Sequence, residues 1–255
     1  MKYKKNIIVT GAAGFLGSNI SERLIKKNYF VYAVDINLKK LKLLEKKFDN
    51  ETIKIAKVDL TKQSEIINFF KSLSKKKVKI NGLINNAAID AVPYNYKKKI
   101  KLNIDSWNKE IEVGLTAAHC LSFLFAEQIR KDRFSIINIG SDLSKIAPNQ
   151  KIYRSSYKNY FKPASYSAIK HGLLGLTKYY ASTYADKGIV CNMISPGPID
   201  KNINNKLTAE IKALIPMNKL ISINNILSAI EFLLDEECNF ITGQNILIDG
   251  GRTII

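Results

Sequence analysis

Three residues in the middle of the chain have the chemistry of a proton-transfer site. Tyr166 and Lys170 are four residues apart, so on a helix a phenol and an ammonium project from the same face. An ammonium near a phenol favours the phenolate, which a general acid/base requires. Ser141 follows the apolar run Phe134–Ile139, where its hydroxyl could hold a substrate oxygen. These side chains predict proton transfer at an oxygen of a small molecule.

A glycine-rich turn near the amino terminus has the pattern that accommodates a dinucleotide. Gly11, Gly14 and Gly17 lie between the apolar run Asn6–Thr10 and an amphipathic stretch. The pyrophosphate of a dinucleotide rests on backbone N–H groups at a helix N-terminus, where side chains would block its approach. The turn therefore predicts a cofactor site.

Asp35, at the end of the second apolar run, indicates which dinucleotide binds. A carboxylate there accepts hydrogen bonds from the ribose hydroxyls of the adenosine and repels a 2′-phosphate. Ala13 offers no cation to that phosphate. The sequence therefore favours NAD over NADP.

Apolar runs of strand length alternate with longer amphipathic stretches along the chain. The predicted strands are Asn6–Thr10, Phe30–Asp35, Ile53–Val58, Gly82–Asn85, Phe134–Ile139, Ile189–Ile194 and Asn245–Ile248. The predicted helices are Leu16–Lys27, Leu38–Lys47, Gln63–Ser74, Ser106–Arg130, Ser165–Asp186 and Ile223–Asp235. Because the strands are apolar almost throughout, we expect both of their faces to be covered, as in a parallel sheet.

This alternation predicts an α/β fold: one Rossmann domain over residues 1–255, with a doubly wound, mostly parallel seven-stranded sheet flanked by helices. Two segments interrupt it. A polar, Tyr-rich insert covers about residues 142–165, and a flap covers about residues 200–222. Long segments of this kind inside a compact domain are more often functional than idle.

Composition limits the partners. The 255 residues are 46% hydrophobic, and 40 Lys+Arg against 22 Asp+Glu give a net charge of +18. The cations are almost all Lys, whereas proteins that read bases rely on Arg, so we expect a solvated Lys-rich surface and no specific nucleic-acid partner. Three Cys without a CxxC pair and two His predict no metal site and a reducing compartment. No apolar run is long enough to cross a membrane, so the sequence predicts a cytoplasmic protein.

Several short motifs occur together in the order typical of one family. They are the glycine turn, Asp59-Leu60, Asn85-Asn86-Ala87-Ala88, Ser141, Tyr166/Lys170, Asn192, Ser195-Pro196-Gly197-Pro198, Thr242-Gly243-Gln244 and Asp249-Gly250-Gly251. On these motifs the chain resembles the compact subgroup of the short-chain dehydrogenase/reductases over nearly its whole length. The resemblance implies an NAD(P)-dependent oxidoreductase that acts on CH–OH groups and forms a homodimer or homotetramer.

The resemblance also implies residue roles. Tyr166 would be the acid/base, Ser141 would orient the substrate oxygen, and Lys170 would favour the phenolate and bind the nicotinamide ribose. The backbone near Ile199 would anchor the carboxamide. The implied cofactor contacts are Gly11, Ala13, Gly14, Phe15, Leu16, Gly17, Asp35, Ile36, Asp59, Leu60, Asn86, Ala87, Ala88, Ile139, Tyr166, Lys170, Pro196, Gly197 and Ile199.

Two positions depart from the family pattern. The glycines are spaced GxxGxxG, with Phe15 where the compact subgroup has its second glycine, a spacing that resembles the extended subgroup. The family's helix Asn, which supports a proton relay to the lysine, aligns with Gly114. A water, Thr116 or another neighbour must therefore replace that side chain, or proton exchange is slower.

The insert carries the prediction about the substrate. Asp142, Tyr153, Tyr157 and Tyr160 are the candidate contacts, and polar aromatics with nearby cations suit a hydroxylated or phosphorylated ligand. A surface flap or an oligomer contact is the alternative. The run Lys-Pro-Ala-Ser-Tyr-Ser-Ala-Ile-Lys-His-Gly is similar to flagellin-modification protein A type oxidoreductases of surface-glycan gene clusters.

That resemblance implies an NAD-dependent oxidoreductase acting on a sugar, sugar phosphate or nucleotide sugar. Two alternatives remain open. One is a 3-oxoacyl-carrier-protein reductase, for which a basic surface would suit an acidic carrier protein. The other is a catalytically weak NAD-binding scaffold, which would explain Gly114 but leave Tyr166 and Lys170 without a role.

Overall fold

A seven-stranded sheet with exclusively parallel strand pairs forms the centre of the protein, in a computed structural model that describes residues 5–49, 51–89, 94–95, 103–128, 133–156, 160–201 and 206–255. The strand order is β3-β2-β1-β4-β6-β8-β9. The strands are β1 Asn6–Thr10, β2 Phe30–Asp35, β3 Ile53–Lys57, β4 Gly82–Asn85, β6 Phe134–Ile139, β8 Ile189–Pro196 and β9 Asn245–Ile248. The predicted doubly wound parallel sheet is confirmed.

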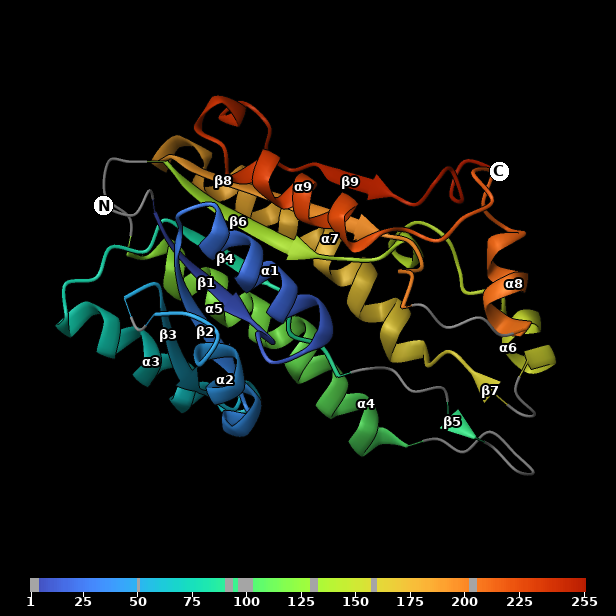
Figure 1. Ribbon diagram of the computed structural model, residues 1–255, viewed down its shortest axis with the longest axis horizontal. Helices are drawn as coiled ribbons and strands as arrows, with labels where there is room; N and C mark the ends of the chain where they lie inside the picture. The colour runs from blue at the N-terminus through green and yellow to red at the C-terminus, as the bar shows by residue number, and fades with distance from the viewer. Residues whose placement is uncertain are drawn as a thin grey trace.

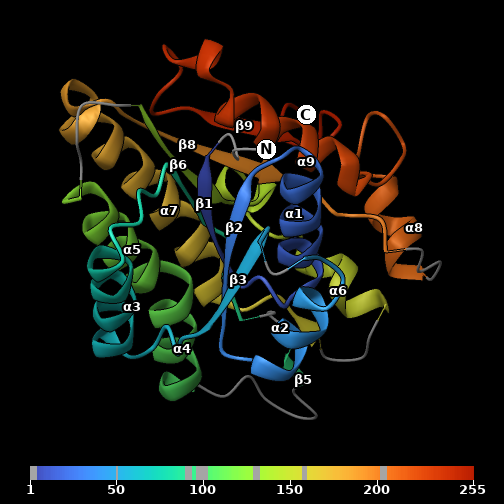
Figure 2. The same ribbon diagram turned by 60° about the vertical axis from the view of Figure 1, so that its left-hand side comes forward.

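Helices cover both faces of this sheet, as Figure 2 shows. One face carries α3 Gln63–Lys75, α4 Ile104–Ile111, α5 Ala117–Ala126 and α7 Ala164–Tyr184; the other carries α1 Phe15–Lys26, α2 Leu38–Glu45 and α9 Ile223–Leu234. Alternate residues of one strand enter the two separate cores: Ile8 faces α3, α5 and α7, while Ile7 and Val9 face α1, α2 and α9. Burial on both faces is the reason that the strands are apolar at nearly every position.

The structure corrects two segments of the sequence-based assignment. The predicted helix Ser106–Arg130 consists of α4, a π-helical turn Glu112–Thr116 and α5, and residues 129–130 lie outside the described part. The predicted irregular insert contains regular elements: the 3₁₀ turn Asp142–Ser144, helix α6 Gln150–Ser156 and strand β7 Tyr160–Phe161, which pairs antiparallel with β5 Tyr94–Asn95.

The remaining elements are the helix α8 Lys206–Lys212, within the predicted flap, and 3₁₀ turns at Ala185–Lys187 and Glu236–Cys238. Figure 1 shows α6, α8, β5 and β7 on the side toward which the strand arrows point, together with the carboxyl terminus. Ligands of open α/β sheets bind outside the carboxyl ends of the strands, so these elements border the place where a site is expected. None of the helices in the described ranges has the length and apolar content needed to cross a membrane.

Candidate active site

Tyr166 and Lys170 lie on the first two turns of α7, and their side chains lie close together. The Lys170 ammonium is 5.5 Å from the centroid of the Tyr166 ring. It also donates a hydrogen bond of 2.9 Å to the carbonyl oxygen of Ile139, the last residue of β6. This bond ties the helix to the strand end that precedes Ser141.

Lys170 is buried, with 6% of its surface exposed. Burial, and then repulsion from the Lys162 ammonium, lower the pKa of Lys170 to about 8. A lysine with such a pKa exchanges its proton readily near neutral pH, which suits a group that works beside an acid/base.

Ser141 is held at the end of β6 by the turn that follows it. Its hydroxyl donates to Oδ1 of Asp142 (3.0 Å) and accepts from the backbone N–H of Leu143 (3.2 Å). The turn Asp142–Ser144 packs against α7, so Ser141 and Tyr166 lie at the same edge of the sheet.

The predicted substrate contacts lie in different environments. The carboxylate of Asp142 is buried and accepts from Nη1 of Arg252 at 2.5 Å, so it holds the Ser141 turn instead of lining an open surface. Tyr153 is half-buried near this pair, and burial raises the pKa of its phenol. Tyr160 forms part of β7 by its backbone, and Tyr157 lies outside the described residues.

The glycine turn forms a cradle made of backbone. Gly11 has a φ of +63°, and a Cβ there would lie 2.8 Å from Cα of Ala87. A Cβ on Gly17 would lie 2.1 Å from the Gly11 carbonyl oxygen, so only glycine fits. Gly14 caps α1 without a side-chain bond, and no acidic residue lies in the first turn of that helix. This cradle fits a diphosphate group, which would bind to backbone N–H groups at the positive end of α1.

The Asp35 carboxylate lies beside this cradle at the end of β2. It accepts hydrogen bonds from the backbone N–H groups of Ala13 (3.0 Å) and Asn37 (2.8 Å), which fix its position. Ile36, the next residue, and Phe15, the first residue of α1, are 58% and 47% exposed. An anchored acceptor with exposed apolar side chains at the start of α1 and after β2 suits an adenosine.

Asn86 connects the exit of β4 to the glycine turn. Its amide donates to the carbonyl oxygens of Thr10 (2.9 Å) and Gly11 (3.3 Å), and the backbone N–H groups of Asn86 and Ala87 donate to Oγ1 of Thr10. Ala88 follows directly. This stretch thus holds the cradle in shape.

Beside β3, the carboxylate of Asp59 accepts from the hydroxyl and the N–H of Thr61, and these hydrogen bonds lower its pKa. Leu60 is buried in the core that contains α3. Directly after Pro196, the last residue of β8, the N–H of Gly197 donates to the carbonyl oxygen of Ile248. The backbone of Ile199 pairs with Ile221. Apart from Tyr166 and Lys170 on α7, the predicted cofactor residues therefore lie at or just after the carboxyl ends of six parallel strands, those after β1 continuing into the first turn of α1.

Gly114 lies in the π-helical turn, facing α7. A Cβ at this position would lie 2.9 Å from Cγ2 of Ile169, so the isoleucine fills the space that a side chain at 114 would need. Thr116 is exposed and therefore does not replace the absent side chain at this buried position. A water as substitute stays a prediction.

The sequence-based reasoning missed three groups. Arg252 pairs with Asp142. The sequence feature that could have pointed to it is its residue type, because arginine is rare in this lysine-rich chain. Lys162 lies over the Tyr166 ring. Ser122 and Asn138 accept hydrogen bonds from the motif residue Asn85 in a buried network between β4, α5 and β6.

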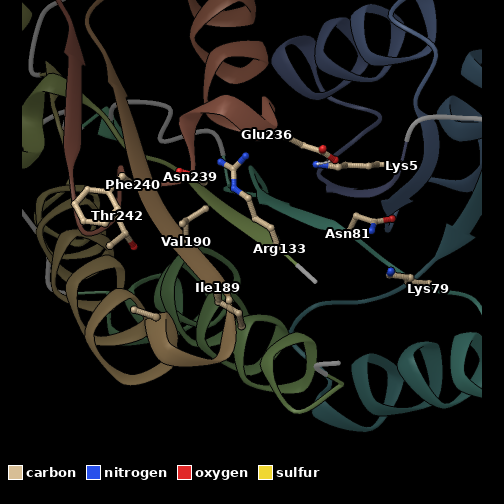
Figure 3. Close-up of a pocket in the computed structure, with 12 residues that line it drawn as sticks. Lys5, Lys79, Asn81, Arg133, Ile189, Val190, Glu236, Asn239, Phe240 and Thr242 are labelled. Atoms are coloured by element: carbon tan, nitrogen blue, oxygen red, sulfur yellow. Dashed lines mark ion pairs between the residues drawn. The ribbon is translucent and has the colours of Figure 1, made fainter. Parts of the chain in front are cut away.

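A groove of about 830 Å³ lies at the opposite edge of the sheet (Figure 3). It is lined by residues at the amino ends of the strands, among them Lys5, Asn81, Arg133 and Ile189. The guanidinium of Arg133 donates to carbonyl oxygens of the segment 235–238, and Lys5 pairs with Glu236 at 3.0 Å. The groove is thus separate from the predicted site. Within the described ranges, no group of three His, Cys, Asp or Glu could hold a metal ion.

Comparisons with known proteins agree with this fold. A family sequence model described as enoyl-(acyl carrier protein) reductase matches residues 11–253. A 3-oxoacyl-(acyl-carrier-protein) reductase FabG from Buchnera aphidicola subsp. Baizongia pistaciae is 32% identical over 254 residues, covering 97% of both chains. The short chain dehydrogenase/reductase dpfgG from Gibberella zeae is 34% identical over 76% of this chain and 69% of its own.

Among solved structures, 4-hydroxyisoleucine dehydrogenase complexed with NADH has a TM-score of 0.84 and 30% identity, covering 99% of this chain and 100% of its own. A short chain dehydrogenase from Leptospira borgpetersenii with bound NAD+ has a TM-score of 0.82 and 26% identity, covering 98% and 93%. The chain belongs to the short-chain dehydrogenase/reductase family, whose members are oxidoreductases acting on CH–OH groups.

Proposed function

We propose that the protein interconverts a secondary alcohol and a ketone with NAD as cofactor, and that Tyr166 moves the proton. The observation that carries this proposal is the placement of Tyr166 and Lys170. The buried ammonium of Lys170 lies 5.5 Å from the centroid of the Tyr166 ring. It is hydrogen-bonded to the end of β6, two residues before Ser141. The glycine cradle lies at the same edge of the sheet.

The cofactor assignment rests on the fit of the residues. The cradle suits a diphosphate, and the anchored Asp35 carboxylate suits free ribose hydroxyls rather than a 2′-phosphate. Similar structures with NADH or NAD+ support it. When bound, the nicotinamide supplies a hydride acceptor or donor.

The residues of the chain supply the remaining chemistry. Ser141 holds the substrate oxygen. The phenolate of Tyr166 takes the hydroxyl proton during oxidation, and the phenol returns it during reduction. Lys170 stabilises the phenolate.

The names of the relatives favour a 3-oxoacyl thioester as substrate. Asp142 was one of the predicted contacts with a sugar substrate. Because its carboxylate is buried in an ion pair with Arg252, this support for a sugar substrate is lost. A sugar-derived substrate remains the second candidate, because α6 and β7 of the insert lie on the side of the strand ends and carry the half-buried Tyr153.

Substrate turnover, followed by NADH absorbance, tests the proposal. We expect reduction of an acetoacetyl thioester, and the same assay with sugar phosphates and nucleotide sugars tests the second candidate. Tyr166→Phe should lower turnover at least about 100-fold and leave NADH binding intact. Tyr184→Phe, which removes a phenol hydroxyl at the other end of the same helix, is the matched control. Full turnover by Tyr166→Phe would refute the acid/base role. NADH binding without turnover of any substrate would favour the scaffold.

We also propose a homodimer or homotetramer. Phe123 on α5 and Tyr179 on α7 are 46% and 56% exposed, which suits a contact with a second copy. Leu121 and Leu173 on the same helices are buried in the chain's own cores instead. Light scattering during gel filtration measures the mass, and a monomer would contradict this proposal.

A further inference from the structure

The ammonium of Lys162 lies beside the phenol ring of Tyr166, and the roles described above do not use it. Its Nζ atom is 4.1 Å from the ring centroid, closer than Nζ of Lys170 at 5.5 Å. Both distances lie within the range, about 6 Å, in which a cation interacts with a ring. Two cations therefore act on one phenol.

The backbone of Lys162 is fixed. The side-chain amide of Gln150, on α6, accepts from the N–H of Lys162 at 3.0 Å and donates to its carbonyl oxygen at 3.1 Å. The next residue, Pro163, is the N-cap of α7. Helices α6 and α7 thus set the position from which the ammonium reaches Tyr166.

Lys162 also acts on Lys170, since its charge contributes to the lowered pKa of that buried group. Lys162 itself is half-buried and keeps more of its hydration. The acidic groups on the neighbouring elements are bonded elsewhere: Glu110 of α4 accepts from Ser165, and Asp142 pairs with Arg252. The charged groups seen in contact with the Tyr166 ring are the ammonium groups of Lys162 and Lys170.

A cation close to the ring favours the phenolate over the phenol. The phenolate carries a full negative charge spread over the ring, whereas the neutral phenol attracts the cation only through its quadrupole. We propose that Lys162 is a positioning residue that acts with Lys170 to stabilise the phenolate form of Tyr166 during proton transfer. This inference rests on the proposed role of Tyr166 as acid/base.

The reaction balances with this assignment. In oxidation the phenolate accepts the hydroxyl proton while the substrate carbon gives its hydride to the bound nicotinamide, and a C=O bond forms. In reduction the phenol donates the same proton to the oxygen. Lys162 gains and loses nothing, and its fixed charge lowers the energy of the state in which Tyr166 is deprotonated.

The test compares Lys162→Met and Lys162→Arg with Lys178→Met, which removes one positive charge from an exposed part of α7. The phenolate is titrated by ultraviolet absorbance in the NAD-loaded protein, and the titration of the same variant with Tyr166→Phe is subtracted. We expect Lys162→Met to move the Tyr166 midpoint up by about one pH unit. Its kcat for oxidation of a 3-hydroxyacyl thioester near neutral pH should fall about tenfold, with KM little changed, because this direction requires the phenolate. Lys162→Arg and Lys178→Met should keep the wild-type midpoint.

An unchanged midpoint in Lys162→Met would overturn the inference. Equal shifts in Lys162→Met and Lys162→Arg would also overturn it, because they would show that shape and not charge matters. NADH binding identifies a variant that no longer folds, and Lys162→Gln then replaces Lys162→Met. Full turnover by Tyr166→Phe is a separate result, which refutes the proposed function itself.

Discussion

The buried ion pair between Asp142 and Arg252 joins the turn that carries Ser141 to the carboxyl-terminal segment. Its atoms Oδ2 and Nη1 are 2.5 Å apart, and the two side chains are 4% and 5% exposed. Removing one partner leaves the other charge buried and unpaired, which costs about 3–5 kcal/mol. The phenol of Tyr153 nearby cannot replace the lost carboxylate, because burial raises its pKa and keeps it neutral.

We therefore expect Arg252→Met to lower the free energy of unfolding by about 3 kcal/mol, and Asp142→Asn to cost a similar amount. The double variant leaves no buried charge. It should be more stable than the sum of the single losses indicates, with a coupling energy of about 2 kcal/mol. Urea unfolding at one fixed protein concentration measures all four chains.

The matched control is Arg23→Met. Arg23 pairs with Glu231 at the surface, where the side chains are 33% and 22% exposed, so this loss should stay below about 1 kcal/mol. The reasoning is refuted if the stability loss of the double variant equals the sum of the two single losses. It is also refuted if Arg252→Met loses no more stability than Arg23→Met. Since Ser141 donates to Oδ1 of Asp142, kcat should also fall in Arg252→Met, which leaves an unpaired carboxylate beside the hydroxyl.

Three further outcomes follow from single sites. Gly114→Asn should lose about 1–3 kcal/mol of stability in urea unfolding, because its Cβ meets Ile169, and adding Ile169→Ala should reduce that loss; an equal loss in both chains contradicts the packing argument. Burial lowers the pKa of Lys170 from 10.5 to about 8, so the unfolded chain binds this proton more tightly than the folded chain. As the pH rises from 8 to 10.5, the free energy of unfolding of wild type should therefore increase by up to about 3 kcal/mol relative to that of Lys170→Met. Urea midpoints at the two pH limits measure this, and a constant difference refutes it. Asp35→Ala should weaken NAD binding about tenfold in fluorescence titration and remove the discrimination against NADP; tighter NADP binding by wild type contradicts the role of Asp35.

The strands could be predicted because both faces of the sheet are buried. Residues such as Ile7 and Ile8 face different cores, so each strand appears in the sequence as an unbroken apolar run. The glycine turn and the pair Tyr166/Lys170 were also predictable, since a turn and a helix fix their geometry over a few residues. Local geometry is what a single sequence specifies most directly.

Other features depend on packing between distant segments. Asp142 and Arg252 are 110 residues apart, and neither residue alone indicates the other. Strands β5 and β7 have two residues each, too few to show a period. The π-helical turn at Gly114 is filled by Ile169 from another helix, so the space for that side chain exists only in the folded protein.

The arginines provide a signal that the net charge of +18 conceals. The chain has five arginines among its 40 cationic residues, so lysine is its usual cation. The three arginine side chains that the structure describes all bind oxygen acceptors: Arg23 binds a carboxylate at the surface, Arg133 binds backbone carbonyls, and Arg252 binds a buried carboxylate. A guanidinium presents several donors in a rigid plane, whereas an ammonium is a compact charge that prefers hydration. In a lysine-rich chain, an arginine therefore indicates a place where the fold requires directed donors, and Arg252 is one that reaches the turn of the predicted active site.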